Sequence, residues 1–457
     1  MVRIGEYTLS FPHEPYPVQV EYMKSVLAAL DASQHALLES PTGTGKTLAL
    51  LCSTLAWAQR HGKKVIYTSR THAQLKQAIA ELRSTSIRVK MAIIGSRSHL
   101  CVHPKVSKLS GSTQNTECTR LVRRRECQFH LALQSSRTEH DLEVRDIEDL
   151  LQDVGLERRA CPYYFSANML RTAQVVFMPY NYLVDFQRRK ALEEGDASFS
   201  IRDAIIVFDE AHNIESVAME AASFQISARH LERCAFDLQS CIDKSGTSMS
   251  RQLYDDFVRL KRFVLNFERI LDVPSEVCEN GDYIFKIFER LQVTTLNYVS
   301  FIHSLERIID YLGLKEDFEM VSDPNSYTPL ESLKSAILVA FSSRREIQHF
   351  GTHLFQSQPH EKNGVLDFWC FSPSIAFKEI AQQAKSIILT SGTLSPLQTL
   401  EQEMSISFQV KLENPHVVES SQILCQILTK GPGGTSLNSA FKNRDSNSVS
   451  PMLHSVS

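Results

Sequence analysis

The stretch Ser40-Pro41-Thr42-Gly43-Thr44-Gly45-Lys46-Thr47 decides the fold. It matches a phosphate-binding loop, except that its first residue is Ser in place of Gly. Small residues let backbone N–H groups surround a β-phosphate, and a helix beginning near Lys46 would add its positive N-terminal end. Lys46 would then reach the β- and γ-phosphates, and the Thr47 hydroxyl would hold Mg²⁺. The alternative is a Gly-rich turn without a ligand, and the apolar strand and helix patterns on either side disfavour it.

The sequence around this loop alternates between strand and helix patterns. Residues 35–39 and 64–68 are short apolar runs typical of buried strands, and helical spacing is found in residues 14–30, 48–59 and 71–82. Strand patterns return at residues 175–178, 204–208 and 386–390. This alternation predicts an α/β fold with a parallel sheet.

The composition is that of a globular chain with several domains. The 457 residues are 43% hydrophobic and 22% charged, and the formal net charge is −3. This length allows roughly two to four domains, and the near-neutral charge means that any nucleic-acid-binding surface must be local. No stretch reaches the roughly 20 apolar residues of a membrane span. No secretory signal is visible before Pro12, so we expect a soluble, intracellular chain.

Two adjacent acids follow the predicted strand 204–208, within Asp209-Glu210-Ala211-His212. They would lie at the carboxyl edge of the sheet, where open α/β sheets bind ligands. Asp209 suits an outer-sphere role at Mg²⁺, and Glu210 can orient and deprotonate an attacking water. His212 can couple the nucleotide to neighbouring elements. Alone these residues could be an ordinary helix cap, but with the phosphate loop they favour ATP hydrolysis.

These two segments resemble superfamily-two helicases of the DEAH type, and further segments narrow the resemblance. Phe11-Pro12 with Pro15-Tyr16 and Gln19 resembles an adenine-recognition segment, residues 68–74 resemble a strand-gripping motif, and residues 390–396 resemble the motif that couples hydrolysis to movement on DNA. In this order the blocks resemble the iron–sulfur DNA helicases related to xeroderma pigmentosum group D. Segments 160–164, 177–183 and 412–416 resemble one branch of that family, and the resemblance extends to about residue 440.

The resemblance implies an ATP-dependent DNA helicase that moves 5′ to 3′ on single strands and binds single-strand and double-strand junctions. It implies a nuclear protein of telomere maintenance, DNA repair and genome stability, with ATP, Mg²⁺ and a [4Fe–4S] cluster as cofactors. It assigns catalytic roles to Lys46, Thr47, Asp209, Glu210 and His212. It assigns nucleotide binding to Gln19, as the base reader, and to Ser40, Pro41, Thr42, Gly43, Thr44, Gly45, Lys46 and Thr47.

Four cysteines lie in a stretch that interrupts the alternation: Cys101, Cys118, Cys127 and Cys161. Their gaps of 17, 9 and 34 residues include no Cys-x-x-Cys pair, so they do not match a zinc ribbon. Spacing alone leaves open whether they are ligands of a [4Fe–4S] cluster or buried free thiols. The resemblance favours all four as metal ligands. We interpret the other six, Cys52, Cys234, Cys241, Cys278, Cys370 and Cys425, as core or surface thiols.

Residues 97–137 carry a local excess of positive charge around these cysteines. The two acids are Glu117 and Glu126, and the eight basic residues are Arg97, Lys105, Lys108, Arg120, Arg123, Arg124, Arg125 and Arg137. Such a surface would attract a DNA phosphate backbone with an affinity that falls as salt rises. The alternative is an ordinary solvated surface.

We therefore predict a RecA-like parallel-sheet motor domain with two insertions. The predicted parts are 1–95 (ATP-binding start of the motor domain), 96–170 (iron–sulfur domain), 171–221 (continuation with the acidic motif), 222–365 (helical, arch-like insertion), 366–412 (end of the motor domain) and 413–457 (start of a truncated second motor domain and a disordered tail). The truncation is predicted because no Gln-x-x-Gly-Arg-x-x-Arg stretch supplies the arginines of a second domain. Three alternatives stay open: a form that binds ATP and DNA without unwinding, a sibling iron–sulfur helicase of the same group, and, less favoured, a zinc-binding structural module.

Overall fold

The computed structural model describes residues 1–134, 143–194, 199–245, 249–314, 328–357, 363–416, 420–422, 426 and 429–430. Arg137, Cys425 and the predicted tail from 431 lie outside the described residues. The chain divides into two units, Met1–Asn414 and Pro415–Ser457. The helices and strands that position the candidate sites all belong to the first unit. No helix in the described ranges has both the length and the apolar character needed to cross a membrane.

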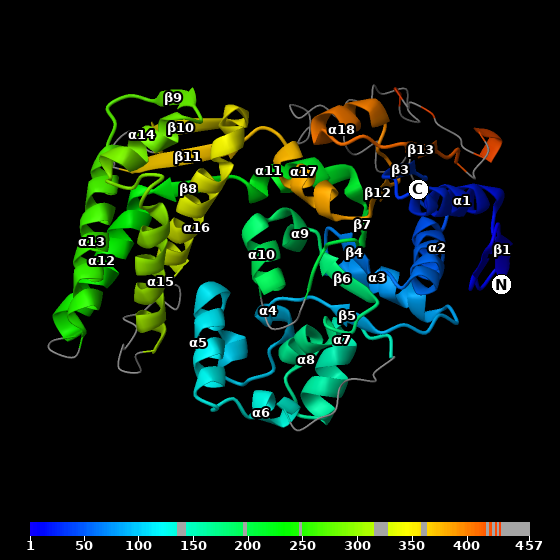
Figure 1. Ribbon diagram of the computed structural model, residues 1–457, viewed down its shortest axis with the longest axis horizontal. Coiled ribbons are helices and arrows are strands. Elements are labelled where there is room, and N and C mark those ends of the chain that lie inside the picture. The colour runs from blue at the N-terminus through cyan, green and yellow to red at the C-terminus, as the bar shows by residue number, and fades with distance from the viewer. Residues whose placement is uncertain are drawn as a thin grey trace. The chain divides into compact units, whose positions relative to one another are not determined.

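A seven-stranded sheet forms the centre of the first unit (Figure 1). In spatial order its strands are β13 (Val410–Glu413), β3 (Ala36–Glu39), β12 (Ser386–Ser391), β7 (Ile205–Asp209), β4 (Val65–Ser69), β6 (Val175–Pro179) and β5 (Met91–Ile93). Every neighbouring pair is parallel. Central strands of such a sheet are covered on both faces, which explains their near-continuous apolar sequences. The sheet confirms the predicted α/β core.

Helices cover both faces of this sheet and share one hydrophobic core with it (Figure 1). One face carries α1 (Pro17–Asp31), α2 (Lys46–His61) and α3 (His72–Arg83). The other face carries α9 (Asn181–Val184), α11 (Ile214–Ala221), α17 (Ser374–Gln383) and α18 (Leu397–Met404), and α10 (Phe186–Glu194) follows α9 along the chain. Because both faces are covered, the carboxyl ends of the strands are the place where side chains from several strands meet.

Residues 96–170, which were predicted as an inserted iron–sulfur domain, lie between β5 and β6, and we call them the cysteine module. Its elements are short: α4 (Arg97–Leu100), η1 (Val106–Lys108), α5 (Gly111–Arg123), α6 (Gln128–Gln134), α7 (Ile147–Leu150), η2 (Leu151–Glu157, a π-helix) and α8 (Pro162–Met169). A separate small core joins Val106, Cys118, Leu121 and Cys127. Two of those four buried side chains are cysteines, whereas other apolar residues of the module, among them Ile147, Val154 and Phe165, belong to the main core.

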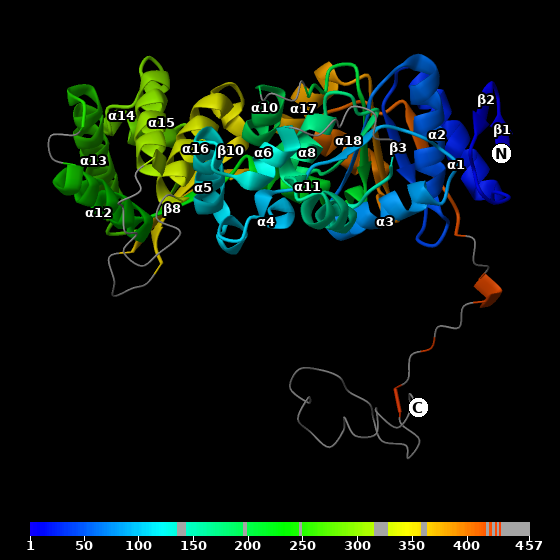
Figure 2. The ribbon, with the colours of Figure 1, turned by 90° about the horizontal axis from the view of Figure 1, so that it is seen from below.

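The second insertion has its own hydrophobic core. Its long helices lie side by side in Figures 1 and 2: α12 (Ala228–Ser245), α13 (Arg251–Leu271), α15 (Tyr298–Leu314) and α16 (Thr328–Ser342), with the shorter α14 (Tyr283–Arg290) beside them. A four-stranded antiparallel sheet joins them, in the order β8 (Phe224–Ser227), β11 (Gly364–Cys370), β10 (Phe350–Gln356) and β9 (Val277–Asn280). The boundary predicted at residue 365 falls within β11.

The sequence patterns located the central strands closely. Each of the five predicted strands lies within one residue of an observed strand at both ends. Short strands were not predicted: β5 and β13 in the main sheet, the antiparallel sheet of the second insertion, and the N-terminal hairpin of β1 (Val2–Ile4) and β2 (Tyr7–Leu9). Segments of three or four residues carry too little periodicity to identify a strand.

Candidate functional site

The predicted phosphate loop connects β3 to α2. Gly43 and Gly45 have φ angles of +83° and +68°, which residues with a Cβ rarely adopt. Gly45 also packs against the amide of Gln19, whose Nε2 donates a 2.9 Å hydrogen bond to the carbonyl of Thr44. The hydroxyls of Ser40 and Thr44 share a hydrogen bond of 2.8 Å. The hydrogen bond from Gln19 and the bond between Ser40 and Thr44 therefore both hold the conformation of the loop.

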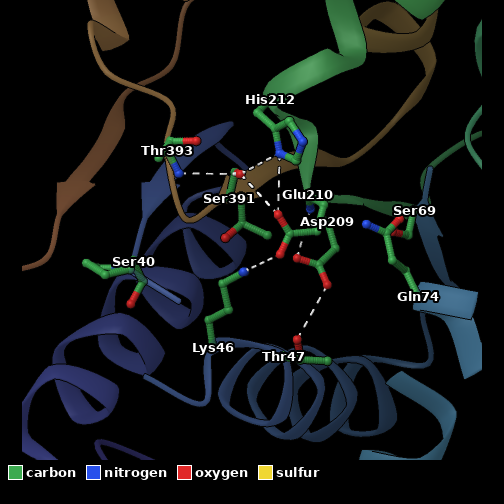
Figure 3. A network of polar contacts seen from close by, with 12 residues as sticks. Ser40, Lys46, Thr47, Ser69, Gln74, Asp209, Glu210, His212, Ser391 and Thr393 are labelled. Carbon is green, nitrogen blue, oxygen red and sulfur yellow. Dashed lines mark hydrogen bonds and ion pairs between the residues drawn. The ribbon is translucent and has the colours of Figure 1, made fainter. Parts of the chain in front are cut away.

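Two strands bring the predicted catalytic residues of the loop and the acidic motif together (Figure 3). Lys46 Nζ forms an ion pair with Glu210. Thr47 Oγ1 donates to Asp209 Oδ2 at 3.5 Å. Glu210 adopts a left-handed conformation, with φ of +57°, as the chain turns away from β7. The sheet therefore unites residues that are about 160 positions apart in the sequence.

Asp209 is a nearly fully buried acid. Burial raises the pKa of its carboxyl, while a hydrogen bond from Tyr67 and the positive charge of Lys46 act in the opposite direction. A carboxylate facing a hydroxyl offers the hard oxygen ligands that Mg²⁺ prefers. The donor set of Asp209 and Thr47 therefore fits the predicted magnesium ion.

A third strand, β12, contributes Ser391 to the same network (Figure 3). Its hydroxyl donates to Glu210 Oε2 at 3.3 Å and lies 3.0 Å from His212 Nδ1. His212 Nδ1 is also 3.4 Å from Glu210 Oε2. Residues 390–396, which resembled a coupling motif, therefore begin in direct contact with the acidic motif.

Sequence reasoning missed several residues of this site. Tyr67 on β4 donates a 2.5 Å hydrogen bond to Asp209, and Tyr180 OH donates to the carbonyl of Glu210 at 3.3 Å. Asn414 Nδ2 donates to Ser40 Oγ at 3.4 Å and to the carbonyl of Val18 at 3.1 Å. In the sequence Tyr67 is one residue of an apolar strand pattern, and only the strand order shows that it faces Asp209.

The predicted strand-gripping segment 68–74 leads from β4 into α3. Thr71 caps this helix by accepting a hydrogen bond from the backbone N–H of Gln74 at 3.3 Å. Ser69 Oγ donates to the Gln74 side chain at 2.9 Å, and Arg70 is exposed to solvent. The next residue on the helix, His72, contacts His99 of the cysteine module with ring centroids 4.6 Å apart. Burial lowers the pKa of His72 to about 4, so it is neutral at pH 7.

The four predicted metal ligands all lie in the cysteine module, and three of them are in or against its small core. Cys118 and Cys127 are part of its small core, Cys101 packs against it, and the backbone N–H of Cys161 donates to the Phe129 carbonyl at 3.0 Å. Burial raises the pKa of the Cys161 thiol to about 12, and the neighbouring Cys118 and Cys127 add to this shift. Within the described ranges, no three or more His, Cys, Asp or Glu side chains are grouped closely enough to hold one metal ion. Four thiols in apolar surroundings are the donor set that polynuclear iron–sulfur clusters use.

The other cysteines differ in burial, and the predicted basic residues differ in their partners and exposure. Cys52, Cys234, Cys241 and Cys370 are buried and Cys278 is exposed. Arg120 pairs with Glu117 at 2.7 Å, and Arg123 is 3.7 Å from Asp310 of the second insertion. The Arg97 guanidinium lies over the Tyr163 ring, 4.3 Å from its centroid. The basic residues exposed to solvent are Lys105, Lys108, Arg123, Arg124 and Arg125.

Together, the parallel sheet, the phosphate loop and the two acids define a nucleotide-binding domain of the RecA-like motor class. The DEAD_2 family matches residues 67–231, and the family described as RTEL1 helicase, ARCH domain matches residues 229–373. The regulator of telomere elongation helicase 1 of Rattus norvegicus is 34% identical over 97% of this chain and 42% of its own length. The same protein of Homo sapiens is 34% identical over 96% of this chain and 43% of its own length.

A solved structure described as Truncated XPD has the same fold, with a TM-score of 0.52 and 18% identity over 86% of this chain and 99% of that one. The chain belongs to the XPD-related helicase family, and within it to the RTEL1 type. This confirms the resemblance to the XPD-related family, and it identifies the branch indicated by segments 160–164, 177–183 and 412–416 as the regulator of telomere elongation helicase. The chain spans about two fifths of the length of the rat and human relatives.

Proposed function

We propose that this chain carries the ATP-binding and DNA-binding part of an iron–sulfur DNA helicase that uses ATP hydrolysis to move 5′ to 3′ along a single strand. The observation that carries the proposal is the meeting of Lys46, Thr47, Asp209 and Glu210 where β3 and β7 end. Preorganised charges of this kind are the main catalytic device in phosphoryl transfer.

The contacts suggest how the residues would act. A nucleotide in the loop would compete with Glu210 for the ammonium of Lys46. Once released from that ion pair, the Glu210 carboxylate could accept a proton from an attacking water. Thr47 and Asp209 would hold Mg²⁺, which neutralises phosphate charge when it is bound. Gln19 lies beside the loop, as the predicted role in recognising the base requires.

We propose that Cys101, Cys118, Cys127 and Cys161 hold a [4Fe–4S] cluster. Cys101, Cys118 and Cys127 lie in or against one small core, and Cys118 and Cys127 influence the pKa of the Cys161 thiol, which supports this assignment. A cluster would cross-link those segments and would need their thiols as thiolates. The exposed Lys105, Lys108 and Arg125 of the same module would contact DNA phosphates. DNA single strands and junctions are the proposed partners.

The biological setting is proposed from the family. The names of the relatives include telomere elongation, and this supports roles in telomere maintenance, DNA repair and genome stability, with a nuclear location. The domain limits predicted from the sequence also remain proposals. A second candidate function is a form that binds ATP and DNA but does not unwind.

The test is DNA-stimulated ATP hydrolysis and strand separation, measured on this chain and on Glu210→Gln. The variant should still bind ATP but hydrolyse it at least about 100-fold more slowly, as expected for the loss of a general base. Glu220→Gln, an exposed acid on α11, is the matched control. Hydrolysis without strand separation would support the second candidate. Unchanged hydrolysis in Glu210→Gln would refute the assigned base.

A further inference from the structure

Glu39 is the last residue of β3 and directly precedes the phosphate loop. Its half-buried carboxylate reaches across to the segment that follows β12. There, Glu39 Oε2 accepts hydrogen bonds from the backbone N–H groups of Leu394 at 2.7 Å and Ser395 at 2.6 Å. Hydrogen bonds to an ionised acceptor are stronger than those between neutral groups. One side chain thus ties the strand that carries the phosphate loop to residues 391–396.

The same segment has further contacts with the nucleotide site at its beginning. Ser391 bonds to Glu210 and lies beside His212. The backbone N–H of Ser40 donates to the carbonyl of Ser391 at 3.0 Å. Gly392 packs so closely against Thr42 that a Cβ there would come within 3.1 Å of Thr42 Cγ2. Residues 391–396 are therefore attached to the acids at one end and to Glu39 at the other.

We propose that Glu39 is a positioning residue that transmits the state of the nucleotide site to the segment 393–396. This inference rests on the proposed function. A nucleotide that draws Lys46 away from Glu210 changes the contacts of Ser391. If Leu394 and Ser395 were not held by Glu39, the backbone of residues 393–396 could move independently of Ser391. The change at Ser391 would then not reach these residues. Because Leu394 and Ser395 are fixed to β3, the whole segment must move when the contacts of Ser391 change. Binding of the nucleotide and binding of DNA then become energetically coupled.

The competing explanation is that Glu39 only satisfies two backbone N–H groups. Two variants and a control separate these roles. Glu39→Ala removes the acceptor, whereas Glu39→Gln keeps an oxygen that can accept both bonds, without the charge. Glu413 is the matched control because it pairs in register with Glu39 on β13 and is exposed. Its side chain forms no hydrogen bond or ion pair with other residues in the described part of the chain.

The experiment measures the affinity of the anaerobically purified chain for a single-stranded oligonucleotide, with and without a non-hydrolysable ATP analogue and Mg²⁺. In the wild type the analogue should change DNA affinity by about 5- to 150-fold, the usual range of coupling between two sites. Glu39→Ala should bring this factor close to one, while its affinity for the analogue stays within about threefold, less than 1 kcal/mol. Glu39→Gln should recover part of the factor, and Glu413→Ala should match the wild type.

Hydrogen exchange and thermal melting complete the test. Exchange at Leu394 and Ser395 should rise in Glu39→Ala only, with an unchanged melting temperature. An undiminished coupling factor in Glu39→Ala would overturn the inference, as would equal losses in Glu39→Ala and Glu39→Gln together with a lower melting temperature. Independent binding of analogue and DNA by the wild type would overturn it and leave the ATP site standing. A wild type that binds no analogue would instead refute the proposed function, and the inference with it.

Discussion

The nucleotide-binding edge of the sheet and the cysteine module position their functional side chains by different means. At the edge, Lys46 is the first residue of α2, and Asp209 and Ser391 are the last residues of β7 and β12. The residues that precede or follow them in these elements are largely buried. In the module, the four predicted ligands lie on short helices and turns, and Cys118 and Cys127 are two of the four buried residues of its small core. The edge is therefore organised by the fold. Parts of the module pack on the main core, and we expect its small core to depend on the group that the cysteines bind.

Of the variants proposed, Cys127→Ser should produce the largest difference between the two regions. Cys127→Ser exchanges a soft thiolate for a harder, usually protonated oxygen, so the cluster should be lost or become labile. Iron should fall from about four atoms per chain in the wild type towards none, with acid-labile sulfide falling in parallel. Protease cleavage should appear within residues 96–170, DNA stimulation of hydrolysis should be lost, and nucleotide affinity should be kept.

Cys278→Ser is the control for that experiment, because Cys278 is exposed on β9. It should keep full iron and sulfide. One zinc per chain without sulfide in the wild type would show a zinc site instead. An anaerobically purified wild type without metal would mean that the four cysteines are ordinary thiols.

Lys46→Ala tests the other region. It removes the ammonium that would bind the phosphates but leaves the loop backbone intact. ATP hydrolysis should fall by about 100- to 1000-fold, the usual effect of losing one preorganised charge or donor. Iron content and melting temperature should not change. Lys24→Ala, at an exposed ion pair on α1, is the matched control. Normal hydrolysis by the Lys46 variant would contradict the phosphate-loop assignment.

Tyr67→Phe is a smaller change within the same edge. The tyrosine hydroxyl bonds to Asp209 and lowers the pKa of its carboxyl, so its loss should weaken the binding of Mg²⁺. We expect about a tenfold higher Mg²⁺ requirement for nucleotide binding, since hydrogen bonds to charged groups contribute roughly 1.5–3 kcal/mol. Tyr22→Phe removes a buried hydroxyl that bonds to Thr390 instead, and should leave the Mg²⁺ requirement unchanged.

The smallest expected effect concerns the stability of the sheet domain alone. Burial and the neighbouring Glu403 raise the pKa of Glu215 to about 7. The folded chain therefore holds a proton that the unfolded chain releases, so the free energy of unfolding should fall as pH rises from about 4 to about 7. Glu215→Gln should be more stable than the wild type by roughly 1–2 kcal/mol at pH 8, a value reduced for the partial exposure of both acids. Thermal melting should show no difference at pH 4, and Glu220→Gln should show none at either pH.

The sequence predicted those parts of the site that are encoded by consecutive residues. The phosphate loop and Asp209-Glu210-Ala211-His212 each place their chemistry within a few positions, so pattern and charge identified them. Tyr67, Ser391 and Glu39 could not be found this way, because their contacts exist only when β4, β12 and β3 become neighbours in the sheet. The same reason explains the unpredicted sheet of the second insertion, where Val365 pairs with Ser227 across more than a hundred residues.

We expect the nucleotide-binding edge to keep its structure without the proposed cluster, whereas DNA binding should require that cluster. The most direct test measures the affinity for an ATP analogue and for single-stranded DNA on one anaerobic preparation, before and after chelation of iron. We predict that DNA affinity falls by at least about tenfold, or 1.4 kcal/mol, while nucleotide affinity is unchanged. Equal DNA affinity in the two samples, or a parallel loss of both affinities, would contradict the claim.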